Sequence, residues 1–196
     1  MFEYPVQNFD HLLGLPGMSD ALLTNHFALY QGYVTNTNTL RKLLSETETG
    51  TPVFNELTRR FGWEWNGMRL HELYFANLSK ETAILNEGAL KEKIASQFGS
   101  IEDWQKGFLA AGAMRGIGWV ILCLDDASGE LMNVWINEHD LGHLAGTTPL
   151  IVMDVFEHAF MLDYGIKRAE YLSVFINALN WPVIEQRFVD SQNRNS

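Results

Sequence analysis

The sequence predicts an α+β fold, with an all-helical N-terminal part and a C-terminal part that mixes helices and strands. Apolar residues recur at helical spacing through most of the first 80 residues. Two short apolar runs, at 120–125 and 131–136, flank a polar turn that is typical of a β-hairpin. A third short run, at 150–153, has the composition of a buried strand. We expect the boundary between residues 80 and 90, which divides the chain into domains 1–85 and 86–196.

The first long helix is predicted to begin at Ser19, a favoured N-cap residue, and to end near Leu44. His26, Tyr30 and Tyr33 lie at positions i, i+4 and i+7, so they share one helical face. A histidine among aromatic residues on a helix is more often a packing residue than a ligand. The spacing therefore identifies a candidate ligand and leaves core packing as the alternative.

Further helices follow the first one. His71 lies among aromatic residues of a second long helix, and an antiparallel hairpin of the two long helices could bring His26 and His71 together. Ser100, with Asp103 three residues on, resembles a capping box that restarts a helix after a break. The polar tail after Phe188 is expected to fray. The remaining helices are predicted at 53–61, from 62 to 78, within 84–113 and at 168–179.

The stretch with the clearest chemistry begins at Asp154, four residues before His158 in an otherwise apolar run. If this run is helical, the carboxylate and the imidazole lie on one face and can bind one cation. Phe156 and Phe160 would then keep bulk water away from the cation. The alternative is an aspartate that favours its helix dipole and a histidine that packs in the core.

Four metal-competent side chains therefore stand out, and they come from three separate segments. Three imidazoles and one carboxylate suit iron, manganese or zinc, and the set is too rich in nitrogen for calcium or magnesium. The spacing alone does not show that the four converge. The candidate ligands are His26, His71, Asp154 and His158.

Composition limits the partners. The net charge of −10 argues against nucleic acid or an anionic membrane as the main partner, because phosphate binding depends on Lys and Arg. No run approaches the ~18 apolar residues that a membrane span needs. Cys123 is the single cysteine, which is consistent with a reducing compartment. We therefore expect a cytoplasmic protein without a signal segment, nucleic-acid partner or membrane partner.

Six pieces of the sequence, in order, resemble the iron/manganese superoxide dismutase family over nearly the whole chain. The most specific of them is the motif Asp-x-x-Glu-His at 154–158. One such piece would be a weak signal, whereas six in the same order make chance implausible. The pieces are His26 with 33–38, His71 with 74–75, 96–100, 116–119, 154–159, and 163–164 with 171–172 and 180–181.

The resemblance implies a long helical hairpin, a C-terminal domain with a three-stranded antiparallel sheet, and a homodimer. It also implies one Mn or Fe ion per chain, whose redox cycling converts superoxide to dioxygen and hydrogen peroxide. Tyr33 matches the family's gateway tyrosine and Trp119 its cavity-wall tryptophan. Glu157 matches the glutamate that reaches across the dimer, and we place Tyr30 with it, just outside the ligands. In this picture the ion is held by His26, His71, Asp154 and His158.

The chain also departs from the family pattern. The segment between the first ligand and Tyr33 is one residue shorter than usual, so an ungapped match would place Asn25 rather than His26 at the ligand position. We prefer His26, because imidazole is the expected ligand. Phe156 replaces a usual tryptophan. Met161 replaces a tyrosine that bonds across the dimer, so that contact is expected to be absent.

The hydrogen-bond donor near the metal is the most informative departure. Iron forms carry glutamine four residues before the second ligand, and this chain has Gly67 there, as manganese forms do. The donor is then expected in the loop after the second strand, where His139 is the candidate and a surface histidine is the alternative. This pattern gives a slight preference for manganese.

Two other functions remain open from the sequence. A zinc hydrolase could use His139 and His143, with Glu138 beside them, although Gly142 suggests a loop rather than the helix that such motifs use. The chain could also be a metal-binding protein of the same fold with low or no dismutase activity, because lost outer partners weaken metal sites by about 10- to 100-fold.

Overall fold

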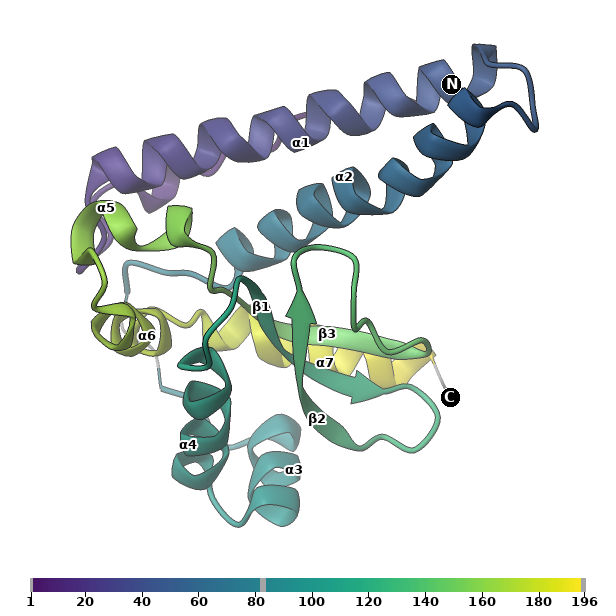
Figure 1. Ribbon diagram of the computed structural model, residues 1–196. Coiled ribbons are helices and arrows are strands. Elements are labelled where there is room, and N and C mark those ends of the chain that lie inside the picture. The colour runs from purple at the N-terminus through teal and green to yellow at the C-terminus, as the bar shows by residue number, and fades with distance from the viewer. Residues whose placement is uncertain (1, 82–83, 195–196) are drawn as a thin grey trace.

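A long helical hairpin lies across a body formed by three strands and the remaining helices (Figure 1). The computed structural model describes residues 2–81 and 84–194. Short 3-10 turns occur at Asp10–Leu12 and Glu157–Ala159. The elements are α1 (Asp20–Glu46), α2 (Pro52–Ala76), α3 (Ala89–Phe98), α4 (Ile101–Gly112), β1 (Gly118–Asp125), β2 (Leu131–Asn137), β3 (Thr147–Asp154), α5 (Met161–Tyr164), α6 (Arg168–Asn177) and α7 (Trp181–Arg194).

Side-chain caps define the starts of both hairpin helices. Ser19 Oγ accepts a hydrogen bond from Leu22 N at 3.1 Å, as the sequence predicts for α1. Thr51 Oγ1 caps α2, and Pro52 occupies its first turn, where a missing N–H costs nothing. The predicted break at Gly62 is wrong, because α2 is one continuous helix. A mid-helix glycine costs only about 1 kcal/mol, and packing of α2 against α1 offsets it.

The sheet has strand order β2-β1-β3, and both neighbouring pairs are antiparallel. This confirms the predicted α+β fold with a three-stranded sheet. In the register of β1 against β3, Trp119 lies directly opposite Asp154. α4 packs against β1 and β2, and α3 packs against β2, whereas α2 and α7 contact β3. The core contains large, fully buried aromatic side chains, including Phe75, Phe108 and Trp104.

The C-terminal segment is a helix, α7, and the prediction of a fraying tail after Phe188 is wrong within the described residues. Trp181, Ile184, Phe188 and Ser191 are buried at spacings of three and four residues. These spacings place them on one face of the helix. The sequence already contains this spacing of three and four residues, although polar residues lie between the buried positions.

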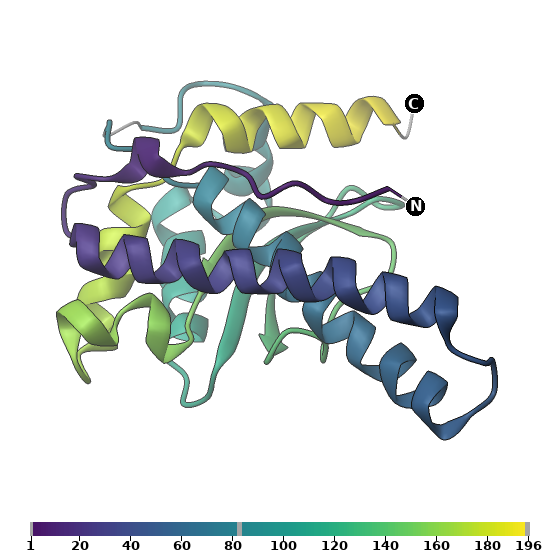
Figure 2. The same cartoon turned by 90° about the horizontal axis from the view of Figure 1, so that it is seen from above.

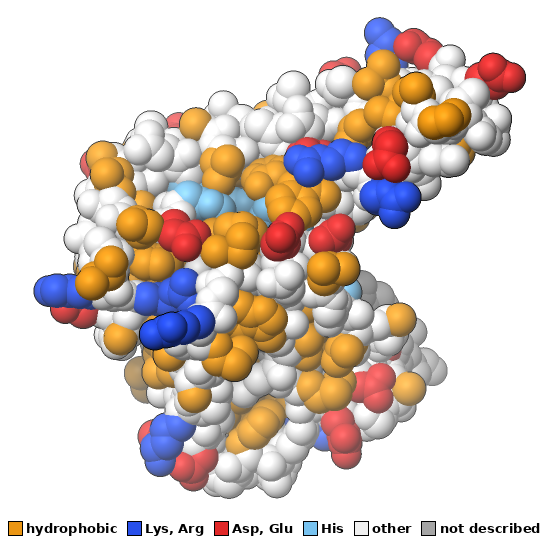
Figure 3. All heavy atoms as spheres, viewed as in Figure 1, with side chains coloured by type: hydrophobic (Ala, Val, Ile, Leu, Met, Phe, Trp, Pro, Cys, Tyr) orange, Lys and Arg blue, Asp and Glu red, His pale blue; other side chains and the backbone are white. Residues whose placement is uncertain are grey.

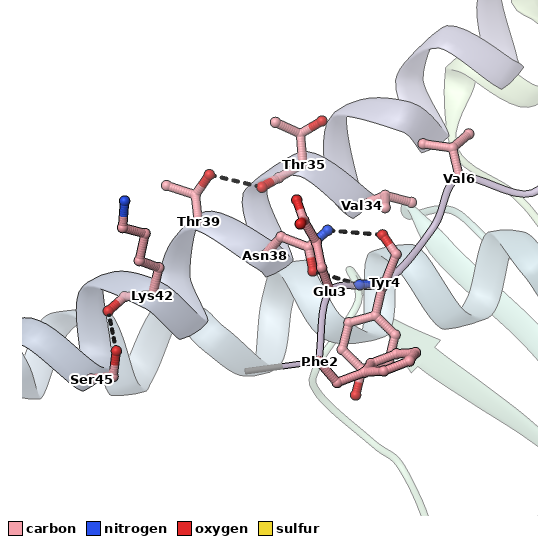
Figure 4. Close-up of a pocket in the computed structure, with 10 residues that line it drawn as sticks. All are labelled: Phe2, Glu3, Tyr4, Val6, Val34, Thr35, Asn38, Thr39, Lys42 and Ser45. Carbon is pink, nitrogen blue, oxygen red and sulfur yellow. Dashed lines mark hydrogen bonds between the residues drawn. The ribbon is translucent and has the colours of Figure 1, made fainter.

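The N-terminal segment runs alongside α1 as an extended strap (Figure 2). Asn38 donates to the carbonyl of Tyr4 and accepts from its amide, both at 2.9 Å (Figure 4). The ring of Tyr4 lies 4.9 Å from the guanidinium carbons of both Arg41 and Arg69, so it also ties the strap to α2. Among the described helices, none combines the length and the apolar character that crossing a membrane requires.

Candidate metal centre

Four side chains from four different elements converge below the helical hairpin. His26 lies on α1, His71 on α2, Asp154 at the end of β3, and His158 in the 3-10 turn Glu157–Ala159. One potential ligand atom from each lies within 4.8 Å of all the others. The Nε2 atoms of the three histidines are 3.2, 3.7 and 3.0 Å from Asp154 Oδ2, in the order of the chain. Asn25, the alternative to the first ligand, is exposed.

The helical arrangement predicted for Asp154 and His158 is wrong. Asp154 ends a strand, Val155 N donates to Gly118 O at 2.9 Å, and the chain then enters the 3-10 turn. Phe156 N donates to Asp154 Oδ1 at 2.8 Å, and this bond folds the chain back on itself. The imidazole therefore approaches the carboxylate because the chain turns sharply, and a four-residue separation does not distinguish this turn from a helix.

Two histidine nitrogens of the cluster have no hydrogen-bond partner among the described residues, as expected of atoms that bind a metal ion. His26 Nε2 and His71 Nε2 are buried and have no hydrogen-bond partner among the described residues. His71 Nδ1 donates to Gly67 O at 2.5 Å, which leaves the lone pair of Nε2 directed at the cluster. The amide of Phe156 occupies Asp154 Oδ1, so Oδ2 is the oxygen that faces the three histidine Nε2 atoms, with His158 Nε2 nearest at 3.0 Å. The donor set of three imidazole nitrogens and one carboxylate oxygen fits one Mn or Fe ion.

The charge states also suit a cation. Burial lowers the pKa of His26, and it lowers the pKa of His71 further, so both imidazoles are neutral near pH 7. Burial alone would raise the pKa of Asp154, but the charge of His158, the hydrogen bond from His158 and the adjacent imidazole of His26 outweigh burial and hold this pKa well below its usual range. The cluster therefore presents one anion and, at His26 and His71, two neutral nitrogen donors, which is the state in which these groups bind metal.

His139 lies fully buried beside this cluster, between Tyr33 and Trp119. Trp119 Nε1 donates to His139 Nδ1 at 3.0 Å, and His139 Nε2 is 2.7 Å from the hydroxyl of Tyr33. The preceding residue, Glu138, has φ of 52°, a left-handed conformation at the reversal that follows β2. The structure thus brings together three residues that the sequence analysis singled out, and the surface alternative for His139 is excluded.

These contacts define the tautomer of His139. An indole N–H can only donate, so Nδ1 must be the acceptor. Burial lowers the pKa of His139 to about 4, so the ring is neutral near pH 7 and carries its proton on Nε2. That N–H donates to the oxygen of Tyr33, which leaves the hydroxyl proton of Tyr33 free to point elsewhere. Burial, with the charge of Asp154 next, raises the pKa of Tyr33 to about 12, so the hydroxyl keeps its proton.

Aromatic rings enclose the cluster. Phe156 stacks on both His139 and His158, with centroid distances of 4.8 and 5.1 Å. Trp63 meets His139 edge to face at 4.9 Å, and the sequence analysis did not single it out. Its only sequence signal was its position on the helix of His71, about two turns earlier. Figure 3 shows histidine side chains at the surface beneath the hairpin, and His158 is 27% exposed, so small solutes can reach the cluster.

The other candidate residues lie outside the cluster. Tyr30 is buried in the hairpin, where its hydroxyl donates to Glu72 at 3.0 Å. Glu157 is exposed and lines a surface pocket with Met161 and Arg168 among its neighbours. His143 Nε2 donates to the carbonyl oxygen of His139. Since Tyr33 and Trp119 occupy both ring nitrogens of His139, the paired metal ligands that a zinc hydrolase would need are not formed.

The fold and the cluster together define a protein with a largely buried site for one transition-metal ion. The family model of iron/manganese superoxide dismutases, C-terminal domain, matches residues 86–187. A superoxide dismutase [Fe] of Cupriavidus metallidurans is 38% identical over 181 residues, which cover 89% of this chain and 90% of that protein. The chain belongs to the iron/manganese superoxide dismutase family.

Other relatives carry both metal names. A superoxide dismutase [Mn] 2 of Haloferax volcanii is 36% identical over 85% of this chain and 84% of its own length. A superoxide dismutase [Fe] of Aquifex aeolicus is 35% identical over 96% of this chain and 93% of its own length. Likeness to these relatives therefore supports either metal.

Proposed function

We propose that this protein is a superoxide dismutase that binds one Mn or Fe ion through His26, His71, Asp154 and His158. The observation that carries the proposal is the convergence of these four ligand atoms within 4.8 Å, with two buried histidine nitrogens that have no hydrogen-bond partner among the described residues. An unpaired buried polar atom costs about 1–3 kcal/mol, so an arrangement with two of them indicates a partner that the protein chain does not supply.

When bound, Mn or Fe supplies a one-electron redox centre that takes an electron from one superoxide anion and returns it to a second. The reaction also consumes two protons, and the chain must deliver them. Tyr33 holds a proton on its hydroxyl oxygen, and His139 donates to that oxygen from Nε2. Because Trp119 fixes the tautomer, the hydroxyl proton remains available to a solute beside the cluster. We propose this role for Tyr33, with His139 and Trp119 orienting it.

We propose manganese as the preferred metal, by a small margin. Gly67 has no side chain, and a Cβ built there would collide with the ring of Tyr33, so a donor cannot be placed at this position without moving Tyr33. We propose that His139, in the loop after β2, is the donor instead, acting through its hydrogen bond to the hydroxyl of Tyr33. A change in the hydrogen bonds around a metal shifts its reduction potential, so the source of the donor matters for the choice between the two metals.

We also propose a homodimer formed through the face around Glu157. Met161, Leu162 and Ile166 are exposed large apolar side chains within nine residues of Glu157, and such clusters mark interaction sites. With Met161 in place of a tyrosine, the dimer would lack the tyrosine–histidine contact expected of the family.

We propose two domains, residues 1–85 and 86–196, in a cytoplasmic protein. The hairpin ends at Ala76, and the family model of the C-terminal domain begins at residue 86, which supports the boundary. Cys123 is free and buried, and burial raises the pKa of its thiol to about 11, so it suits a reducing compartment and is unreactive. The net charge of −10 disfavours nucleic acid and anionic membranes as partners.

Metal reconstitution of the purified protein tests the function. The metal-free protein is loaded with Mn, Fe or Zn in parallel, the bound metal is measured by elemental analysis, and superoxide decay is followed. Fast decay with about one Mn or Fe per chain supports a dismutase, and full activity with iron alone would contradict the preference for manganese. Bound Mn or Fe without decay would overturn the activity and indicate a metal-binding protein of this fold.

A further inference from the structure

Arg187, on the C-terminal helix α7, bonds to two of the three elements that carry buried ligands, α2 and β3. Its Nη1 donates to Leu150 O on β3 at 2.9 Å, and its Nη2 donates to Leu73 O on α2 at 3.3 Å. Leu73 follows His71 by two residues, and Leu150 precedes Asp154 by four. One rigid guanidinium group therefore spans the gap between these two ligand-bearing elements.

Asn77 completes a three-way junction at the same place. This fully buried residue accepts a hydrogen bond from Arg187 on Oδ1 and donates through Nδ2 to Val152 O at 3.0 Å. Its carbonyl accepts from Asn180 N, just before α7. The end of α2, the middle of β3 and the start of α7 are thus bonded to one another within a few residues of the ligands.

The position of Arg187 is not explained by an ion pair. Among the described residues no carboxylate lies within ion-pair distance of it, and burial lowers its pKa to about 10. The last turn of α2 has no basic residue of its own, although the C-terminal end of a helix favours a cation. Arg187 supplies this cation from α7, through its hydrogen bond to the carbonyl of Leu73, two residues after His71.

We propose that Arg187 is a positioning residue for the metal centre, which sets the separation of α2 from β3 and so of His71 from Asp154. This inference rests on the proposed metal site. The two ligand atoms are 3.7 Å apart, and a slide of either element by a fraction of an ångström would change the ligand geometry. Arg187 acts through the backbone and touches neither ligand.

Arg187→Lys is the sharpest variant, because it keeps the charge and the apolar stem but cannot bond to Leu73, Leu150 and Asn77 together. Arg168→Lys is its matched control. Arg168 also donates two hydrogen bonds to backbone carbonyls, those of Met114 and Gly116 at 2.7 and 2.8 Å, in a loop that carries no ligand. Asn77→Asp is a second test of the junction, since it keeps the acceptor for Arg187 and removes the donor to β3.

The experiment measures the dissociation constant for Mn(II) by competition with a chelator, the electron paramagnetic resonance spectrum of bound Mn(II), and the thermal midpoint of the metal-free protein. We expect Arg187→Lys to weaken metal binding by about 10- to 100-fold and to change the spectrum, as loss of an outer partner does. Asn77→Asp should likewise weaken metal binding and change the spectrum. Arg168→Lys should change only the thermal midpoint.

A wild-type affinity and spectrum in both junction variants would overturn the inference, and so would an equal loss of affinity in Arg168→Lys. If Arg187→Lys does not fold, Asn77→Asp decides by the same criteria. A wild-type protein that binds neither Mn nor Fe would instead overturn the metal site itself, so the two failures are distinct.

Discussion

The two halves of the metal centre are built in opposite ways. His26 projects from near the start of α1 and His71 from near the end of α2, the 27- and 25-residue helices of the hairpin, and both are almost fully buried. Asp154 and His158 lie where β3 ends and the chain turns, and His158 is 27% exposed. Regular helices therefore provide a dry, fixed pair of ligands, and an irregular turn provides the charged ligand and the one that solvent reaches.

The largest expected effect comes from deleting one histidine on each side. Both His26→Ala and His158→Ala should abolish metal retention and activity, because each removes one of four ligands. Only His26→Ala should also destabilise the metal-free protein, by about 2 kcal/mol, since it opens a buried cavity. Elemental analysis, thermal melts and circular dichroism measure these effects, and helical content should survive in His158→Ala. Normal metal loading of that variant would show that the ligand assignment is wrong.

The next largest effect is on the rate of superoxide decay, and it concerns His139 in the loop after β2. His139→Ala should retain metal but slow superoxide decay by about 10- to 100-fold, because Tyr33 loses the group that orients its hydroxyl. His143→Ala is the control, since among the described residues the side chain of His143 hydrogen-bonds to the carbonyl of His139 and to neither Tyr33 nor a ligand. Rates come from pulse radiolysis, with metal content measured on the same samples. An unchanged rate in His139→Ala would remove His139 from the mechanism.

Lowering the pH should reduce the stability of the metal-free protein, because the fold keeps His139 in its neutral form. The pKa of His139 is about 4 in the folded protein, against about 6.5 in an unfolded chain, so the unfolded state binds more protons between these values. The free energy of unfolding of the metal-free protein should therefore fall as the pH is lowered through this window, with roughly 3 kcal/mol of the loss due to His139. Urea titrations at pH 7, 5.5 and 4 measure this, and His139→Gln should lose less than the wild type. Parallel curves for the two proteins would contradict this assignment.

The smallest expected effect concerns the packing of α2 against α1 at Gly67. A Cβ at Gly67 collides with the ring of Tyr33, so Gly67→Ala should cost about 1–3 kcal/mol and displace Tyr33. Gly62→Ala, on the same helix, has nothing within 4 Å of its Cβ and should stabilise the protein by up to about 1 kcal/mol. Thermal melts of the two variants compare them directly. Equal stabilisation in both would mean that Tyr33 yields without cost.

Helices with strong local signals could be predicted well. The start of α1 at Ser19 follows from its capping hydroxyl and the apolar period after it. The false break at Gly62 arose because glycine interrupts helices in isolation, whereas contact with α1 holds α2 together. α7 was missed because its polar residues mask the spacing of Trp181, Ile184 and Phe188. Local propensity does not report such tertiary contacts.

The site was harder to predict than the fold. The four-residue spacing of Asp154 and His158 suggested a helix, and the chain reaches the same proximity by a strand end and a turn. The placement of His139 between Tyr33 and Trp119 depends on contacts across 106 and 20 residues, so only the family resemblance pointed to it. Trp63 had no signal beyond helical spacing, and the junction at Arg187 had none at all.

The order of the ligands along the chain has a consequence for synthesis. His26 and His71 emerge from the ribosome first, and Asp154 follows His71 by 83 positions. At about 5–20 residues per second, the nascent hairpin waits roughly 4 to 17 seconds with two histidines and no carboxylate. Two imidazoles alone make an incomplete site. Tight metal loading therefore has to follow translation of β3 and its docking on the hairpin, which makes metal selection a late event governed by the metal that is available once most of the chain has been made.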